Sequence, residues 1–308
     1  MSPPDEPARA ASLPMALLTA MRPKQWIKNL LVFAGFVFTL NERWRLFSPE
    51  MWRYLGDSCA AFVLFSLISS SVYLLNDVRD VENDRRHPVK KRRPIASGAL
   101  PPRVAVITAI CLMVSCLILA TLLSPPFAAV CAGYLVMQFA YIYFLKEVVL
   151  LDVFVIALGF VLRAVSGAVV LGAVISPWLY TVTLLGALFL AFCKRRHELM
   201  LLDESAGQHR KILESYTLSL LDNLTSIVAS STIMAYSLYT FTSPSLPGNN
   251  LMMLTIPFVI FGLFRYVYLA HAHGEGGSPE DVFLKDKPLI ATIALWILTT
   301  GLILGLKR

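Results

Sequence analysis

The chain has 308 residues, of which 56% are hydrophobic and 15% are charged, and its formal net charge at pH 7 is +7. Soluble domains carry about 45–50% apolar and about 25% charged residues, so this composition excludes an ordinary soluble protein. The apolar residues come in blocks long enough to span a bilayer, which takes about 20 residues each. The composition therefore predicts an all-α polytopic membrane protein.

Long apolar stretches, separated by charged or Pro/Gly-rich breaks, predict nine transmembrane helices in a single domain over residues 1–308. A polar and interfacial segment, residues 1–21, precedes them, and no signal peptide is expected there. The fifth and eighth spans contain Arg163 and Arg265. The predicted spans lie near residues 28–42, 58–75, 104–123, 127–145, 148–171, 177–193, 223–242, 250–270 and 288–306.

Lysine and arginine are distributed unevenly between alternate loops. With the N-terminus inside, cytoplasmic segments hold 20 of these 27 residues and outer segments hold 5. The positive-inside rule therefore predicts a cytoplasmic N-terminus in the cell membrane and an outer C-terminus. Seventeen of the 20 acidic residues also fall inside, mostly in the loops 76–103 and 194–222. A site that holds an anionic substrate through a divalent metal needs both signs of charge.

The first inner loop opens with regularly spaced aspartates. Asp77, Asp80 and Asp84 follow an i, i+3, i+7 pattern, so they share one face if the second span continues as a helix. Like charges stacked in this way repel unless a cation lies between them, and Mg²⁺ prefers carboxylate, water and phosphate oxygens. The spacing thus favours a magnesium site. The alternative is a solvated face on which Arg79 and Arg85 neutralise the aspartates.

A basic run, residues 85–94, follows directly and includes Arg85, Lys90 and Arg92. Alone, it would indicate a topology anchor or a patch for anionic lipid headgroups. Beside three aspartates it is better explained as a cradle for phosphate groups. The second inner loop opens with Lys194 and Glu198, spaced i, i+4, where an ammonium and a metal-assisting carboxylate would lie together. The alternative there is an ordinary exposed ion pair.

Two further basic sites stand near or within the spans. Arg163 lies inside the fifth span, where an arginine faces the bundle interior or an aqueous cavity. It would contact a lipid headgroup or a substrate phosphate, or alternatively pair with a buried carboxylate such as Asp152. Before the first span, Lys24 and Lys28 are expected on one helical face beside Trp26. They would bind phosphate, or alternatively anchor the helix at the membrane surface.

These motifs resemble those of the UbiA superfamily of intramembrane prenyltransferases. Asn76-Asp77-x-x-Asp80-x-x-x-Asp84 is similar to the first aspartate motif of the family, and Arg92-Arg93-Pro94 and Ser97-Gly98 are similar to the residues that trail it. The stretch from Tyr141 to Lys146 resembles the Tyr…Leu-Lys element between the fourth and fifth helices of the family. The resemblance implies a bundle of nine transmembrane helices with helical cytoplasmic loops over a central cavity, and Mg²⁺ as the cofactor.

The second motif departs from the pattern of the quinone-type members. Those members carry an Asp-x-x-x-Asp motif, whereas this chain has Lys194-x-x-x-Glu198. This and other segments resemble a branch of the family that transfers 5-phosphoribose from phosphoribosyl pyrophosphate to a polyprenyl phosphate such as decaprenyl phosphate. Replacing an aspartate by lysine exchanges a metal ligand for a phosphate donor, which suits a substrate with a 5-phosphate besides its diphosphate. The other segments are residues 22–29, 71–82, 162–164, 194–199, 214–217 and 279–281.

The resemblance to that branch implies a Mg²⁺-dependent glycosyltransferase that releases pyrophosphate and serves arabinan synthesis in the cell envelope. Glu198 would assist the metal, and Arg163 would orient the lipid phosphate. The metal ligands would be Asn76, Asp77, Asp80 and Asp84, and the residues contacting the substrates would be Lys24, Lys28, Asn76, Arg85, Lys90, Arg92, Tyr141, Lys146, Arg163, Lys194 and Arg195.

Two other functions stay open. One is a UbiA-type aromatic prenyltransferase that uses a prenyl diphosphate donor, and the other is a non-enzymatic transporter or lipid-binding membrane protein. The expected partners are the two substrates and the membrane, with no nucleic acid; a homo-oligomer stays open.

Overall fold

The computed structural model describes residues 12–87, 89–174, 177–204, 211–243, 246–272, 282–283 and 285–305. These residues are almost entirely helical and contain no named strand, so the all-α prediction is confirmed for them. The α-helices are α1 (Leu13–Ala20), α2 (Ala34–Phe38), α3 (Pro49–Arg79), α4 (Val81–Arg86), α5 (Pro102–Leu123), α6 (Pro125–Tyr143), α7 (Leu151–Val170), α8 (Pro177–Glu204), α9 (Leu218–Thr242), α10 (Ile256–Ala272) and α12 (Lys287–Gly305). The 3₁₀-helices are η1 (Pro23–Phe33), η2 (Lys90–Arg92), η3 (Leu145–Glu147), η4 (Lys211–Ser215) and η5 (Leu251–Thr255).

Seven helices within the described residues are long and apolar enough to cross a membrane. They are α3, α5, α6, α7, α9, the continuous run of η5 and α10, and α12. The remaining two predicted spans correspond to α8, which has 28 residues, and to the run of η1 and α2. The protein is therefore a multi-pass membrane protein, and nine crossings stay a prediction.

Local sequence explains where several of these helices begin. α3, α5 and α6 each have proline in the first turn, where the missing N–H removes no intrahelical hydrogen bond. The side chains of Ser48 and Ser124 accept hydrogen bonds from the backbone N–H of Met51 and Phe127, which caps the N-termini of α3 and α6.

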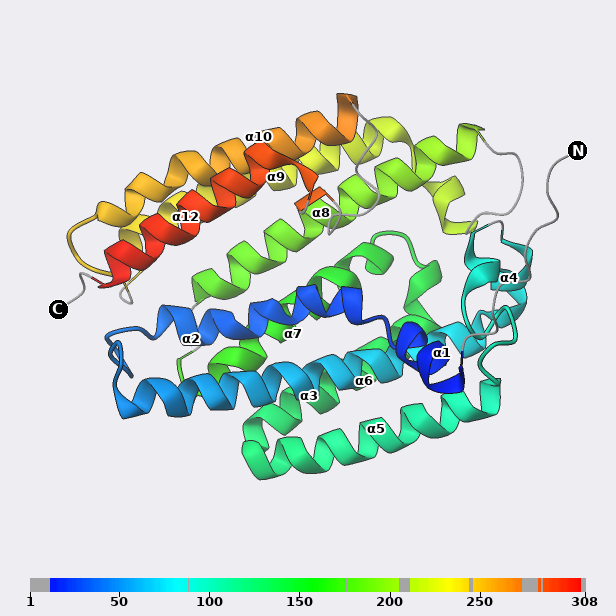
Figure 1. Ribbon diagram of the computed structural model, residues 1–308. Helices are drawn as coiled ribbons and strands as arrows, with labels where there is room; N and C mark the ends of the chain where they lie inside the picture. The colour runs from blue at the N-terminus through cyan, green and yellow to red at the C-terminus, as the bar shows by residue number, and fades with distance from the viewer. Residues whose placement is uncertain are drawn as a thin grey trace, which may run out of the picture.

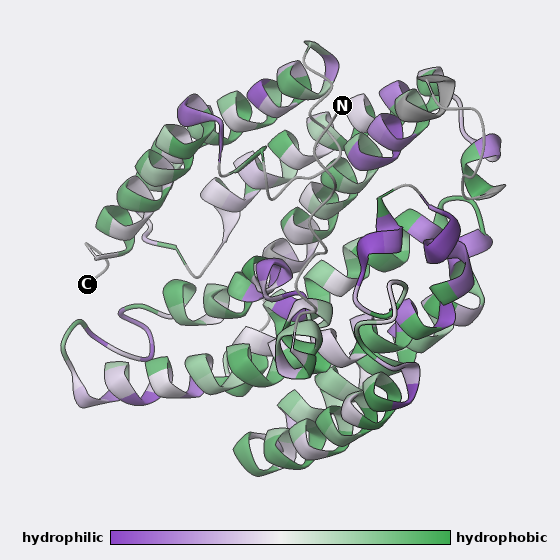
Figure 2. Ribbon diagram, turned by 45° about the vertical axis from the view of Figure 1, so that its right-hand side comes forward, coloured by the Kyte–Doolittle hydropathy of each residue, from purple (hydrophilic) through white to green (hydrophobic). Residues whose placement is uncertain are grey.

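Figure 1 shows the long helices side by side, with α8, α9, α10 and α12 in one group and α3, α5 and α6 in the other. α7 contacts α3, α6 and α8, so it joins the two groups. Two buried apolar clusters follow this division: one contains Phe189 and Tyr266, and the other contains Phe65 and Phe127. Most hydrophilic segments, purple in Figure 2, gather at one end of the bundle, around α4 and the C-terminal end of α8, while the loop between α2 and α3 at the lower left is also partly purple.

The first predicted span begins as a 3₁₀-helix, which has three residues per turn. On η1, Lys24 lies with Ile27 on an exposed face, whereas Lys28 is half-buried. Residues spaced i, i+4 are about 120° apart in this geometry instead of nearly aligned. The prediction that Lys24 and Lys28 share one face is therefore wrong.

Candidate active site

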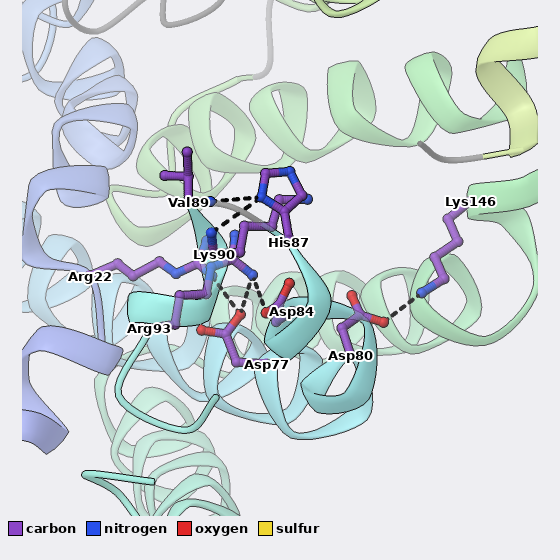
Figure 3. Close-up of polar contacts among 9 residues, drawn as sticks. All are labelled: Arg22, Asp77, Asp80, Asp84, His87, Val89, Lys90, Arg93 and Lys146. Atoms are coloured by element: carbon purple, nitrogen blue, oxygen red, sulfur yellow. Dashed lines mark hydrogen bonds and ion pairs between the residues drawn. The ribbon is translucent and has the colours of Figure 1, made fainter. Parts of the chain in front are cut away.

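The aspartate motif lies where α3 meets α4. α3 ends at Arg79 and α4 begins at Val81, with Asp80 between them at φ −89° and ψ 8°. The expected continuous helix is thus interrupted at Asp80. Asp77 and Asp84 are almost fully buried, at 2% and 4% exposure. Figure 3 shows these two carboxylates beside each other, while the carboxylate of Asp80 is directed away from them, toward Lys146.

One arginine joins the two buried carboxylates. Nη1 of Arg93 donates to Oδ1 of Asp77 at 3.1 Å and to Oδ2 of Asp84 at 2.7 Å (Figure 3). Arg22 donates from Nη2 to the same oxygen of Asp77 at 2.5 Å, and its guanidinium lies 5.0 Å from the centre of the Tyr73 ring. Two cations therefore neutralise two buried anions, through charge-assisted hydrogen bonds.

Arg22 and Arg93 were not among the predicted site residues. Each stands directly before a proline, which disfavours the α-helical conformation in the preceding residue. Arg22 takes the left-handed conformation, at φ 55°, and Arg93 is extended, at φ −61° and ψ 144°. An Arg-Pro pair on either side of an aspartate motif is the sequence signal that would have pointed to both.

Asp80 has a different partner. Nζ of Lys146, on η3, donates to Oδ1 of Asp80 at 3.0 Å. This contact ties the junction of α6 and α7 to the aspartate motif. Tyr141, at the end of α6, is half-buried and interacts electrostatically with Arg195. The junction of α6 and α7 thus lies close both to the aspartate motif and to Arg195 on α8.

The basic run is only partly gathered around the aspartates. Arg85 donates to Oε1 of Glu82 at 3.0 Å and to the carbonyl of Ala96 at 3.3 Å, and its side chain is half exposed. Arg92 is exposed, and Lys90 is half-buried with its backbone N–H donating to the His87 ring.

Arg79 contacts a backbone carbonyl and an aromatic ring instead of the three aspartates. Arg79 donates to the carbonyl of Ile142 and lies over the Tyr143 ring, 4.5 Å from its centre. The alternative expectation was a solvated face on which Arg79 and Arg85 neutralise the aspartates. It is wrong, because Arg22, Arg93 and Lys146 pair with them instead. Asn76 is half-buried, and its carbonyl accepts from the backbone N–H of Asp80.

A second charged cluster lies in the C-terminal half of α8. Arg195, 3% exposed, donates from Nε to Oδ2 of the fully buried Asp152 at 2.8 Å and from Nη1 to Glu198. The hydroxyl of Tyr216 donates to Oδ1 of Asp152 at 2.7 Å and accepts from the backbone N–H of Leu150 at 2.8 Å. Burial, together with the hydrogen bond to Asp152, raises the pKa of Tyr216 to about 12. Lys194 is exposed beside this cluster.

Asp152 and Tyr216 were not predicted as site residues. Asp152 was instead the suggested partner of Arg163, and this pairing is wrong, because Asp152 binds Arg195. Arg163 is 5% exposed and donates to Asn29, Gly159 and Tyr134. Pairing between distant helices leaves no local signal in the sequence.

The donor set of the aspartate motif suits a hard divalent cation. Carboxylate oxygens are the ligands that Mg²⁺ takes in proteins, usually with water and substrate phosphates completing its shell. Two of the carboxylates already contact one cationic nitrogen. Among the described residues, no three His, Cys, Asp or Glu side chains are gathered closely enough to hold a metal without rearrangement. Asp80 would have to turn from Lys146 to join the other two.

Comparisons with known proteins agree on one family. The model of the UbiA prenyltransferase family matches residues 47–275. The decaprenyl-phosphate phosphoribosyltransferase of Mycobacterium tuberculosis (strain H37Rv) is 37% identical over 291 residues, 94% of this chain and 95% of that one. The enzyme of the same name from Mycolicibacterium smegmatis is 36% identical, over 94% and 92%.

A solved structure shares the fold. A UbiA homolog from Archaeoglobus fulgidus, in a structure with GPP and Mg²⁺ bound, has a TM-score of 0.71 at 18% identity, over 94% of this chain and 100% of that one. At this level of identity the likeness shows the fold alone. With the family model and the full-length relatives, it shows that the chain belongs to the UbiA prenyltransferase family.

Proposed function

We propose that this protein transfers 5-phosphoribose from phosphoribosyl pyrophosphate to a polyprenyl phosphate such as decaprenyl phosphate, releasing pyrophosphate. The observation that carries the proposal is its likeness, over nearly the whole of both chains, to enzymes named for this reaction. The charged clusters support it, because Arg22, Arg93, Lys146 and Arg195 could bind phosphate oxygens in place of or in addition to the carboxylates that they contact in the free protein. Arabinan synthesis in the cell envelope is the expected use of the product.

The aspartate motif is the proposed diphosphate site. Asn76, Asp77, Asp80 and Asp84 would hold Mg²⁺, with Glu198 assisting, and the ion would neutralise the charge that develops on the leaving pyrophosphate. In the free protein Arg93 and Arg22 keep the two buried carboxylates in place. Phosphate oxygens would offer Arg93 an equally strong partner, so it would stay paired when the substrate enters.

The remaining cations are proposed to hold phosphate groups. Lys146 and Arg195 are fixed by carboxylates from other helices, which orients them before substrate binds. Such preorganised charges stabilise developing negative charge without reorganising. Further proposed contacts are Lys24, Lys28, Arg85, Lys90, Arg92, Tyr141 and Lys194.

No general base is required in this reaction. The carbon–oxygen bond between ribose C1 and pyrophosphate breaks, and C1 becomes oxocarbenium-like. The lipid phosphate, ionised near pH 7, attacks C1 from the opposite face and inverts it. Because no proton has to be transferred, a site built from aspartates, arginines and lysines is sufficient for the reaction. We also propose that this site faces the cytoplasm, as the positive-inside count favours.

Purified protein supplied with labelled phosphoribosyl pyrophosphate, polyprenyl phosphate and Mg²⁺ should form labelled lipid and pyrophosphate. Asp77→Asn should abolish this transfer, whereas Asp57→Asn should retain it. Asp57 lies on the same helix, 20 residues earlier, about 30 Å along its axis. Size-exclusion profiles check that both variants fold.

The same assay separates the alternatives. Labelled lipid is expected; product only from an aromatic acid and a prenyl diphosphate would identify an aromatic prenyltransferase instead. If neither product forms, and Asp77→Asn binds Mg²⁺ as the parent does, the result would favour a transporter or lipid-binding protein. Crosslinking of the purified protein addresses the homo-oligomer.

A further inference from the structure

The segment Pro23–Phe33 is an unusually long 3₁₀-helix, with 11 residues. Runs longer than three or four residues are uncommon because the hydrogen-bond geometry is poorer than in an α-helix. An isolated chain would not keep this conformation. Contacts with the neighbouring helices must therefore hold η1 in it.

Those contacts repeat every three residues, which is the period of the 3₁₀-helix. Nε1 of Trp26 donates to Oγ of Ser70 at 2.9 Å. One turn later, Nδ2 of Asn29 donates to Oγ of Ser66 at 2.9 Å. After another turn, Val32 is fully buried. In an α-helix, at 3.6 residues per turn, these three side chains would be spread over about 120° around the axis instead of lying in one row.

Arg163 completes the attachment from α7. Its Nε donates to Oδ1 of Asn29 at 2.7 Å, Nη1 to the carbonyl of Gly159 at 2.7 Å, and Nη2 to the hydroxyl of Tyr134 at 3.2 Å. Its guanidinium carbon also lies within 5.2–5.6 Å of the ring centres of Phe65, Tyr134 and Phe160. In the part of the chain that the structure describes, all these partners are neutral.

A buried arginine without a carboxylate is costly inside a membrane, so it is retained for what it holds in place. The neutral acceptors and ring faces offset part of that cost. Arg163 donates to three acceptors, and only one of them, the side-chain oxygen of Asn29, belongs to η1. Arg163 therefore links η1 to α7 and α6 through a single amide.

The far end of η1 is fixed by backbone packing. A Cβ atom on Gly167 would lie 1.8 Å from the carbonyl oxygen of Val32, so α7 and η1 are in direct backbone contact there. The near end leads into Arg22, which contacts Asp77. Because Gly167 packs against Val32 at the far end, a change in the length of η1 would be taken up at the near end, at Arg22 and at the carbonyl of Met21, which accepts from Oγ of Ser70 at 2.9 Å.

The length depends on the helix type. The rise per residue is about 2.0 Å in a 3₁₀-helix and about 1.5 Å in an α-helix, so 11 residues would shorten by about 5 Å on conversion. We propose that Arg163 and Asn29 are positioning residues, which hold η1 in its three-residue register and thereby keep Arg22 at Asp77. The kinetic part of this inference rests on the proposed function, and the structural part does not.

The structural part is tested with nitroxide labels at single cysteines at residues 24, 25, 27, 28, 30 and 31, which leaves Trp26 and Asn29 in place, in a protein whose five native cysteines are replaced. In the parent, collisional accessibility should repeat every three residues, highest at positions 24, 27 and 30, which are exposed. Asn29→Leu should abolish this period because it removes the acceptor for Arg163, and Arg163→Lys should abolish it because one nitrogen replaces the three guanidinium nitrogens that reach three separate acceptors. Asn29→Asp should keep it, because a carboxylate still accepts from Arg163.

Arg43→Lys is the matched control. Arg43 also ties the segment before α3 to α7, donating to the carbonyls of Leu171 at 3.3 Å and Gly172 at 2.5 Å, at the C-terminal end of α7 and beyond Arg163. This variant should keep the three-residue period and should leave the KM for phosphoribosyl pyrophosphate unchanged. Asn29→Leu should raise the KM for phosphoribosyl pyrophosphate about 10-fold, the loss of one charge-assisted contact, with kcat changed less than about 3-fold.

A period of 3.6 in the parent, or an unchanged period in Asn29→Leu, would overturn the register role. A lost period with an unchanged donor KM would overturn the positioning role. If the parent shows no phosphoribosyl transfer, the proposed function fails, while the accessibility scan still decides whether Arg163 and Asn29 hold η1.

Discussion

Replacing Arg93 by glutamine should strengthen Mg²⁺ binding to the free protein while it weakens catalysis. The guanidinium of Arg93 contacts both buried carboxylates, Asp77 at 3.1 Å and Asp84 at 2.7 Å. A metal ion at these carboxylates must displace at least one of those hydrogen bonds. Arg93 is thus a competitor of the metal before substrate binds and a partner of the diphosphate afterwards.

The magnitude follows from the bond that is displaced. A hydrogen bond to a charged group contributes about 1.5–3 kcal/mol. The side chain of Arg93 is 28% exposed, so solvent screening favours the lower value. At about 1.4 kcal/mol per factor of ten, Arg93→Gln should lower the Kd for Mg²⁺ about 10-fold.

Isothermal titration calorimetry with Mg²⁺ and no substrate measures this directly. Arg92→Gln is the control, since it removes the same charge from the adjacent, exposed position. It should change the Kd less than about 3-fold, because only long-range, screened attraction is altered. An Arg93→Gln protein that binds Mg²⁺ no more tightly than the parent, or no more tightly than Arg92→Gln, would refute the competition. Transfer by Arg93→Gln should be slower than by the parent at saturating Mg²⁺.

Three further outcomes are expected. A chelator should stop transfer without unfolding the protein, and added Mg²⁺ should restore it; transfer that persists would exclude the metal role. Asp152→Asn should lower the free energy of unfolding in detergent by about 2–3 kcal/mol. This is less than the usual loss for a broken buried ion pair, because Glu198 still binds Arg195. Tyr216→Phe should lower the free energy of unfolding by about 1 kcal/mol. Gly167→Ala should destabilise by at least about 1–3 kcal/mol through overpacking, and Gly301→Ala, which meets open space, should not.

The positions of the spans could be predicted from the sequence because crossing a bilayer is a local requirement. The stretch 104–123 was predicted and α5 is Pro102–Leu123. The 3₁₀ geometry of η1 could not be predicted in this way. It depends on side chains of α3 and α7 that are 37 and 134 residues away from Asn29. A helical period calculated from the local sequence therefore placed Lys24 and Lys28 on one face, wrongly.

The same distinction applies to the candidate site. The aspartate spacing was visible in the sequence, because three aspartates within eight residues are unusual beside an apolar span. The partner of each carboxylate was not, because charge pairs form between elements that only the fold brings together. Arg163 was expected to meet an anion, since a buried cation usually does, but Asn29 and three aromatic rings surround it instead.

Asp77, Asp80, Asp84 and Asp152 are each held by a cation from another segment of the chain, whereas Glu198 pairs with Arg195 on its own helix. Asp77 is held from before η1 and from after η2, Asp80 from η3, and Asp152 from α8. These ion pairs join the aspartate motif to the segments before η1, after η2 and between α6 and α7, and they join α7 to α8. A metal-bound diphosphate would bind both members of the pairs that hold Asp77, Asp80 and Asp84, the carboxylates through the metal and the cations through phosphate oxygens, so its entry would leave no buried charge unpaired, which would be costly. The pair of Asp152 and Arg195 includes no proposed metal ligand, so it would keep Arg195 oriented while the substrate binds.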